Sequence, residues 1–343
     1  MQSTRGASTR GAAAPAVAGT TDKTGSRPPV IGAGEHRYEV IHDWGELPAA
    51  ISYGNTHGVC EDSQGRIYIH HSVHATSESH DSMVVFDAQG RFIKSWGKEF
   101  KGGAHGLHIR KETGGEFLYL CDTDRAIVQK TTLEGEEVWT TGYPGESEAY
   151  RPGPDGQRPK YSPTNLAIAP NGDIYVGDGY GSSFINQYNR NGGFIRTFGG
   201  KGGAAGQLSC PHGLIVDERG KETMLLVADR KNNRLQYFTL DGQHSSFVSG
   251  TNLPCHFHIR ENGDLLIPDL GARVTIFDKN NELVLHLGDD STSDWRANRK
   301  LSRDHFIPGK FVSPHSACFD HEGNIFVVEW VEIGRVTKLR HVA

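Results

Sequence analysis

The sequence lacks the features that would indicate a membrane protein or a nucleic-acid-binding protein. It has no run of 18 or more apolar residues, which excludes a membrane-spanning helix. Its 36 lysines and arginines are outnumbered by 41 acidic residues and form no basic stripe, which argues against a nucleic-acid partner. No segment sustains the apolar period of a helix. We therefore expect a strand-rich protein that acts on a small-molecule substrate without a nucleic-acid or membrane partner, and we expect a monomer.

Cysteine is scarce and lacks the spacing of a redox or zinc motif. The five cysteines stand at positions 60, 121, 210, 255 and 318, without a C-x-x-C pair. Four of them lie within three residues of a histidine that recurs along the chain. We interpret them as buried thiols in tightly packed strands, which favours a reducing compartment.

The first 34 residues lack the apolar core of a secretory signal. They are rich in Ala, Gly, Ser and Thr and contain a single acid, Asp22. This composition predicts a disordered tail over residues 1–34. A transit peptide is the alternative, but the stretch has no amphipathic apolar residues. We expect a cytoplasmic protein.

Glycine, in contrast, is abundant at 43 residues and punctuates a repeated unit. Each unit opens with a small or apolar residue, then usually a histidine and a glycine, and continues as two strand-like runs joined by a turn. The residues at the marked position are His57, His105, Asn165, His212, His256 and His315, at steps of 48, 60, 47, 44 and 59 residues. Such periods are typical of four-stranded propeller blades. The sequence therefore predicts an all-β, six-bladed β-propeller over residues 35–343.

A propeller must close its ring, because an open ring would expose strand edges. The last unit lacks an outermost strand, and we expect residues 38–42 to supply it. The two longest steps contain polar insertions, residues 143–163 and 288–312, each just before an inner strand. Both should lie on the face where the inner strands begin, either as surface loops or as a lid over the pore.

The marked histidines predict a metal site on the propeller axis. His105, His212 and His315 belong to alternate blades, so they can meet with threefold geometry. Three neutral imidazoles with one open position form the ligand set of catalytic zinc. His57, Asn165 and His256, together with His71, are candidates for a second layer. The alternative is that the histidines cap inner strands through backbone hydrogen bonds.

Motifs within residues 162–242 resemble those of a known enzyme family. They are P-T-N-L-A-I at 163–168, Y-V-G-D-G-Y at 175–180, P-H-G-L at 211–214 and V-A-D-R-K-N-N-R at 227–234. They are similar to the catalytic core of peptidyl-α-hydroxyglycine α-amidating lyase, a six-bladed propeller of NHL-type repeats. Weaker similarity covers about residues 55–340. The resemblance implies zinc at His105, His212 and His315, Tyr180 as the base on a substrate hydroxyl, and Arg230 beside it.

The chain departs from this family at several positions. Ser72 stands near the place of a second active-site arginine, in the run I-H-H-S-V-H at 69–74. Ser316 replaces an aspartate that the family links to calcium, so a structural Ca²⁺ is open to doubt. Gly181 replaces a cysteine of a family disulfide. The metal and tyrosine machinery is expected to persist with a changed substrate pocket.

These features favour a metal-dependent, lyase-like enzyme that acts on a small hydroxylated substrate. Zinc is the expected metal, although imidazole ligands accept other divalent transition metals. Two alternatives stay open. One is a non-enzymatic NHL-repeat propeller that binds a partner or acts as a scaffold. The other is a propeller lactonase-type hydrolase, whose metal site is usually richer in carboxylates.

Overall fold

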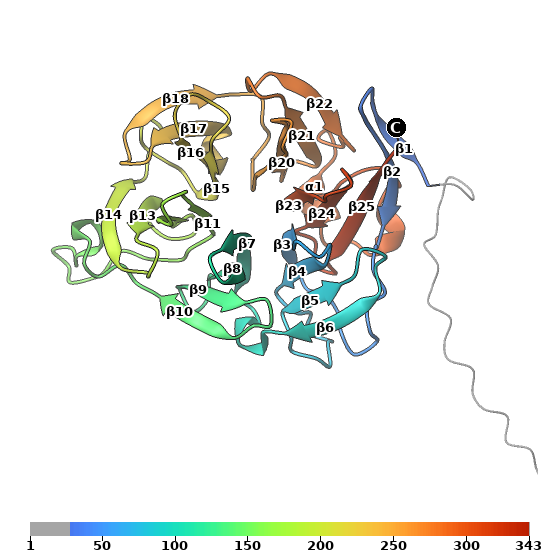
Figure 1. The fold of residues 1–343 in the computed structure, drawn as a ribbon, viewed down its shortest axis with the longest axis horizontal. Coiled ribbons are helices and arrows are strands. Elements are labelled where there is room, and N and C mark those ends of the chain that lie inside the picture. Colours follow the sequence, from blue (N-terminus) through green and yellow to red (C-terminus); the bar gives the residue numbers. More distant parts are fainter. Residues whose placement is uncertain (1–27, 343) are drawn as a thin grey trace, which may run out of the picture.

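Six antiparallel sheets surround a central axis, as the sequence predicts (Figure 1). The computed structural model describes residues 28–342. The first three blades follow one another along the chain. Blade 1 contains β3 (Thr56–Glu61), β4 (Ile67–His71), β5 (Met83–Phe86) and β6 (Phe92–Trp96). Blade 2 contains β7 (Ala104–Glu112), β8 (Gly115–Asp122), β9 (Ile127–Thr132) and β10 (Glu137–Thr141). Blade 3 contains β11 (Asn165–Ile168), β12 (Ile174–Gly177), β13 (Phe184–Tyr188) and β14 (Phe194–Gly199).

The second half of the ring repeats this pattern. Blade 4 contains β15 (Pro211–Asp217), β16 (Met224–Asp229), β17 (Arg234–Thr239) and β18 (His244–Val248). Blade 5 contains β19 (His258–Ile259), β20 (Leu265–Asp269), β21 (Arg273–Phe277) and β22 (Leu283–Leu287). Blade 6 contains β23 (Pro314–Phe319), β24 (Ile325–Glu329) and β25 (Arg335–His341), followed by two strands from the N-terminal side. Short helices lie in the connections: η1 (Lys98–Phe100), η2 (Glu148–Tyr150), η3 (Arg230–Asn232), α1 (Trp295–Asn298) and η4 (Arg303–His305).

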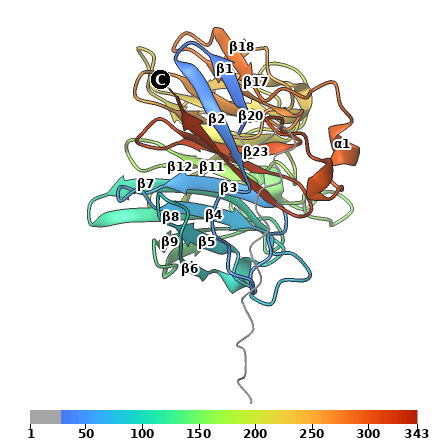
Figure 2. The same cartoon turned by 90° about the vertical axis from the view of Figure 1, so that its right-hand side faces the viewer.

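The predicted closure is confirmed. β2 (His36–His42) pairs antiparallel with β25, so the N-terminal side of the chain supplies the fourth strand of the last blade. β1 (Val30–Ala33) pairs with β2 as a fifth strand (Figure 2). The tail predicted for residues 1–34 therefore ends earlier than expected, because residues 30–33 form this strand. Residues 1–27 of that tail lie outside the described residues.

The core consists of apolar layers between neighbouring blades. Six clusters of buried side chains each join residues of two adjacent blades, as where Leu226 and Leu235 of blade 4 meet Phe257 and Ile267 of blade 5. Each blade is therefore apolar on both faces, which explains the β-branched and aromatic runs. All five cysteines are buried free thiols, as predicted.

The turns after the inner strands repeat one device. In blade 1, Asp62 accepts hydrogen bonds from the backbone N–H groups of Gln64 and Arg66 at 2.9 Å, and Gly65 adopts a φ of 77°. This aspartate-capped turn needs a left-handed residue, which glycine supplies without strain. The same arrangement recurs in blade 6 at Asp320 and Gly323. It fixes where the inner strands of blades 1 and 6 end.

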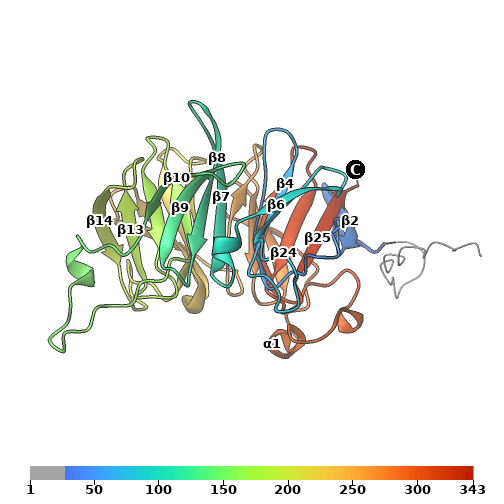
Figure 3. The same ribbon diagram turned by 90° about the horizontal axis from the view of Figure 1, so that it is seen from below.

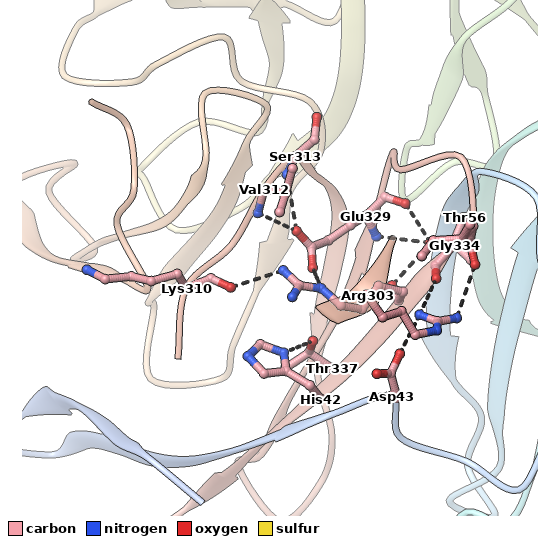
Figure 4. Close-up of polar contacts among 12 residues, drawn as sticks. His42, Asp43, Thr56, Arg303, Lys310, Val312, Ser313, Glu329, Gly334 and Thr337 are labelled. Atoms are coloured by element: carbon pink, nitrogen blue, oxygen red, sulfur yellow. Dashed lines mark hydrogen bonds and ion pairs between the residues drawn. The ribbon is translucent and has the colours of Figure 1, made fainter. Parts of the chain in front are cut away.

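Both insertions extend from one face of the ring, the face where the inner strands begin (Figure 3). The second insertion is tied to the ring closure (Figure 4). Arg303 forms an ion pair with Asp43 at 2.6 Å, and the Lys310 carbonyl accepts a hydrogen bond from Arg335. The carboxylate of Glu329 accepts hydrogen bonds from the backbone N–H groups of residues 312 and 313. Between residues 28 and 342, no helix has the length and apolarity needed to cross a membrane.

Candidate metal centre

The histidines of the repeat reach the axis through irregularities in the inner strands. The pairing of β7 with β8 shifts register between Ala104 and Leu107, on either side of His105. The same kind of shift occurs at His212 in β15 and at His315 in β23. A bulge leaves one residue unpaired and re-aims its side chain. In blade 3, Asn165 occupies the marked position and β11 pairs with β12 without a shift.

Each of the three alternate-blade histidines has one ring nitrogen committed to the next blade. Nδ1 of His105 donates to the carbonyl of Thr164 at 2.6 Å. Nδ1 of His212 donates to the carbonyl of Cys255 at 2.8 Å, and Nδ1 of His315 donates to that of His57 at 2.9 Å. A carbonyl accepts and never donates, so Nδ1 must carry the proton in a neutral ring. The lone pair is then on Nε2 in all three residues, as metal-binding imidazoles require.

The three rings lie close to one another at the axis. The ring centroids of His105, His212 and His315 are 4.7 to 4.9 Å apart. Nε2 of His315 is buried and has no hydrogen-bond partner among the described residues. His57, which we expected in a second layer, packs directly against His105 and His315, with centroid distances of 4.7 Å to each. Four imidazoles therefore form one cluster, here called the axial histidine cluster.

Tyr180 completes this cluster. Its hydroxyl lies 3.1 Å from Nε2 of His105 and 3.2 Å from Nε2 of His212. The single proton of the Tyr180 hydroxyl can be donated to only one of these two nitrogens. At least one Nε2 lone pair in the cluster is therefore left without a hydrogen-bond donor. The guanidinium of Arg230 lies over the Tyr180 ring, 5.3 Å from its centroid. The residues that the resemblance implied are thus brought together from four blades.

The turn that carries Tyr180 is held by Asp178, a residue that sequence reasoning did not single out. Its carboxylate accepts hydrogen bonds from the backbone N–H of Ser162 at 2.7 Å and from the Tyr150 hydroxyl at 2.7 Å. Both partners belong to the first insertion. Burial raises the pKa of Asp178 to about 6. The sequence does contain a sign of this role, because most of the repeated units have an acidic residue directly after their second strand, as Asp178 is here.

Burial keeps the cluster uncharged. It lowers the pKa of His105 to about 3 and holds the pKa values of His212 and His315 well below the ordinary 6.5. Protons therefore do not compete for the Nε2 lone pairs near neutral pH. Burial also raises the pKa of Tyr180, and the positive charge of Arg230 opposes that rise.

The donor set fits a transition-metal ion. Ligand atoms approach within 4.8 Å of one another in two sets that share His315: one with His57 and His105, the other with His212 and Cys255. Burial raises the pKa of the Cys255 thiol to about 11, which favours the all-imidazole set because a metal binds the thiolate. Calcium does not fit Ser316, since this residue offers a hydroxyl where Ca²⁺ prefers carboxylate oxygens. Neither set contains both His105 and His212. Metal binding by His105, His212 and His315 together stays a prediction.

The other expected second-layer residues have contacts of their own outside the four-imidazole cluster. His71 accepts a hydrogen bond from the backbone N–H of Val73, and its ring packs on Tyr53. Asn165 hydrogen-bonds His108, and the ring of His256 lies 5.1 Å from that of His108. His108 follows His105 on β7 and is not at a marked position, which is why sequence reasoning missed it.

Arg299 of the second insertion was also missed. Its guanidinium stacks on Trp330 at 3.5 Å and donates to the side-chain oxygen of Asn55 at 3.0 Å. The carbonyl of Asn55 accepts a hydrogen bond from the backbone N–H of Ser72, where the family would have an arginine. Arg299 also interacts electrostatically with Tyr180. Its position depends on how a 25-residue insertion folds back, which no local pattern reveals.

Comparisons with known proteins agree with the resemblance seen in the sequence. No family model matches the chain. The chain is 28% identical over 284 residues to peptidyl-alpha-hydroxyglycine alpha-amidating lyase 1 of Drosophila melanogaster, covering 76% of this chain and 48% of that protein. It is 30% identical over 240 residues to the peptidyl-glycine alpha-amidating monooxygenase of Mus musculus, covering 61% of this chain and 23% of that protein. The chain thus spans half or less of the length of these curated relatives.

Solved structures share the fold. The chain superimposes on virginiamycin B lyase of Staphylococcus aureus with a TM-score of 0.55 and 16% identity, covering 89% of this chain and all of that one. It superimposes on a gluconolactonase of Xanthomonas campestris with a TM-score of 0.58 and 14% identity, covering 92% and 96%. At these identities the likeness extends to the architecture alone. The chain is therefore a six-bladed β-propeller similar in sequence to the amidating lyases.

Proposed function

We propose that the chain is a metal-dependent, lyase-like enzyme that breaks a C–N or C–O bond at a hydroxyl-bearing carbon of a small substrate. One observation carries the proposal. The Tyr180 hydroxyl lies 3.1 and 3.2 Å from the Nε2 atoms of His105 and His212, inside a buried cluster of neutral imidazoles. A scaffold has no need for unpaired nitrogen acceptors around a buried phenol, which are costly to keep without a ligand.

His105, His212 and His315 would hold the metal, with zinc the expected ion, and His57 is a further candidate ligand. When bound, zinc would act as a Lewis acid on a coordinated hydroxyl and lower its pKa. The backbone carbonyls of residues 164, 255 and 57 orient the imidazoles, because each one fixes a ring nitrogen. This arrangement fixes the orientation of the three rings, and Nε2 of His105 and of His212 both lie beside the Tyr180 hydroxyl.

Tyr180 would move the proton. The substrate hydroxyl loses its proton to the phenolate oxygen of Tyr180, the freed electron pair forms a carbonyl, and the C–N or C–O bond breaks. The leaving nitrogen or oxygen takes a proton, so the elimination needs no oxidant or reductant. Arg230 makes the phenolate accessible, because its guanidinium opposes the effect of burial on the pKa of Tyr180.

The substrate class that fits best carries a carboxylate near the reacting carbon. Ser72 cannot bind it as an arginine would, but Arg299 lies beside Ser72 through Asn55. Stacking on Trp330 holds the guanidinium of Arg299 in place. Nη1 of Arg299 lies 4.0 Å from the exposed carboxylate of Glu332. Arg299 would therefore anchor the carboxylate from the second insertion.

A test compares metal content and turnover in the same proteins. Wild type, a His105→Ala/His212→Ala/His315→Ala variant and Tyr180→Phe would be purified without a His tag and analysed for zinc by mass spectrometry. We expect the triple variant to hold one zinc ion fewer than wild type and Tyr180→Phe to hold as much zinc as wild type. On α-hydroxyglycine derivatives and related carbinols, we expect Tyr180→Phe to be slower than wild type by about 10²- to 10⁴-fold. A metal-free wild type after reconstitution would contradict the proposal and favour a binding propeller. Opening of lactones without elimination would favour the hydrolase.

A further inference from the structure

The propeller axis has a second end, away from the insertions. A cavity of about 540 Å³ opens there between the final residues of the inner strands. β3, β7, β19 and β23 contribute to its walls. The axial histidine cluster lies at the start of the same strands, so the two regions are distinct. None of the residues assigned to the proposed reaction lines this cavity.

Two imidazoles in this cavity have unpaired nitrogens. His108 and His256 line it, their ring centroids lie 5.1 Å apart, and His256 is 4% exposed. Nε2 of each ring is buried without a hydrogen-bond partner anywhere in residues 28–342. A buried polar atom without a partner is costly, so two of them on neighbouring rings call for a partner that both can share.

The other nitrogen of each ring is already fixed. His108 hydrogen-bonds the side chain of Asn165, and His256 hydrogen-bonds the backbone of Ala317 and lies 3.3 Å from the Ser316 hydroxyl. A ring that donates through Nδ1 presents a lone pair at Nε2. The axial histidines are oriented in the same way. Asn165 and His256, which we expected in a second layer around the axial histidine cluster, therefore belong to the pair formed by His108 and His256.

The surroundings favour a cation over a proton. Burial lowers the pKa of His108 to about 4 and holds that of His256 well below 6.5, so neither ring takes a proton near pH 7. Three carboxylates, Glu61, Glu261 and Asp320, lie at the cavity walls against one guanidinium, that of Arg260. An acidic, partly enclosed opening concentrates cations.

We propose that His108 and His256 form a second metal site, which binds a divalent transition-metal ion such as Zn²⁺ with water from the cavity completing the coordination. Two imidazole nitrogens select a transition metal over calcium or magnesium, which prefer oxygen ligands. His258 supports the site in another way. Its Nδ1 accepts a hydrogen bond from the backbone N–H of Phe319 at 3.2 Å, so its Nε2 carries a proton and can donate to a bound water.

The experiment counts zinc in variants of each site. Chelated protein would be loaded with ZnCl₂, desalted and analysed by mass spectrometry, with circular dichroism as a check on folding. We expect two zinc ions per chain in wild type, one in His108→Leu/His256→Leu and one in His105→Ala/His212→Ala/His315→Ala. The matched control is His321→Gln. It removes an imidazole from the cavity wall that is exposed and paired with Glu61, and it should keep both ions.

The two sites can fail independently. If wild type binds a single zinc ion and the His108→Leu/His256→Leu variant still binds it, the second site is overturned and the axial centre stays intact. His108 and His256 would then share a water molecule. If the leucine variant does not fold, the single variant His256→Gln replaces it. In the background of the axial triple variant, His256→Gln should remove the remaining ion, and retention of that ion would equally contradict the proposal.

Discussion

At the residue scale, the chemistry depends on which nitrogen of each axial histidine is free. Nδ1 of His105, His212 and His315 is hydrogen-bonded to a carbonyl of the following blade. The free Nε2 atoms of His105 and His212 lie beside the Tyr180 hydroxyl, and burial keeps the imidazoles neutral. The same backbone contacts that join neighbouring blades therefore prepare the metal ligands.

Arg230 provides a test of how the Tyr180 phenol is tuned. Its guanidinium is buried over the phenol ring and approaches the thiols of Cys210 and Cys255 at 3.2 and 3.8 Å. Without this charge, burial raises the pKa of Tyr180 unopposed. We expect Arg230→Gln to lower kcat by about 10²-fold and to move the rising limb of the pH–rate profile to higher pH.

Arg230→Lys is the matched control, because it keeps a positive charge at the site and should retain part of the activity and a smaller shift. Zinc content should match wild type in both variants. An unchanged pH profile in Arg230→Gln, with normal zinc, would assign Arg230 to packing against the cysteines.

Much of this site is predictable from the sequence for a physical reason. A residue at a fixed position of every blade must point to the same axis, so the repeat alone brings His105, His212 and His315 together. Tyr180 and Arg230 follow from the family resemblance. His57 cannot be separated from His256 in this way, because the two differ in local strand pairing: a register shift lies at His57, whereas His256 precedes the short strand β19.

At the scale of elements, the second insertion connects the ring closure to the proposed substrate site. Arg303 and Lys310 attach it to Asp43 and Arg335, and Arg299 attaches it to Trp330 and Asn55. The insertion is therefore held in place over the face of the ring where the inner strands begin. This arrangement favours the interpretation as a cover for the pore over that of an unattached surface loop.

Arg299→Ala tests the role of this insertion in substrate binding. We expect KM for a carboxylate-bearing substrate to rise about 10- to 100-fold, the value of one or two charge-assisted hydrogen bonds, with a smaller change in kcat. The matched control is Arg296→Ala, because Arg296 lies on α1 just before Arg299 and its side chain stacks on Trp295 instead. Equal loss of affinity for a substrate that lacks the carboxylate would show that Arg299 acts through folding of the insertion.

The closing strand β2 permits a test by deletion. β2 buries Tyr38 and Val40 between blades 5 and 6 and covers the edge of β25. We expect deletion of residues 1–44 to lower the melting temperature by about 10 °C or more, because at least two large apolar side chains lose their burial. Deletion of residues 1–27 leaves β1 and β2 in place and should change it little. Equal melting temperatures for both deletions would contradict closure by β2.

Deletion of residues 1–33, which the sequence alone presents as harmless, should have an intermediate effect. Ile31 of β1 packs against the same core cluster, and β1 pairs with β2. The sequence predicted β2 because the last blade needed a partner strand. It offered no comparable reason for β1, since a fifth strand satisfies no rule of ring closure.

At the scale of the whole molecule, closure of the ring depends on a histidine that must stay neutral. His42 ends β2; its Nδ1 hydrogen-bonds the Thr337 hydroxyl at 2.9 Å, and its Nε2 accepts a hydrogen bond from the backbone N–H of Gly309 at 3.0 Å. It therefore joins the neighbouring strands β2 and β25 to the second insertion. Burial, with a contribution from the charge of Arg335, lowers the pKa of His42 to about 2.

This shift makes the closure sensitive to acid. The unfolded chain takes up a proton at His42 near pH 6.5, whereas the folded chain resists it down to about pH 2. The stability that neutral His42 contributes is thus complete above pH 6.5 and is lost progressively as the pH falls below that value.

We expect the melting temperature of His42→Gln to fall less steeply between pH 7 and pH 4 than that of wild type. His321→Gln should not flatten this limb, because Glu61 raises the pKa of exposed His321 and its contribution has the opposite sign. Parallel melting curves for His42→Gln and wild type would place the acid sensitivity in the other buried histidines, whose neutral rings surround the axis.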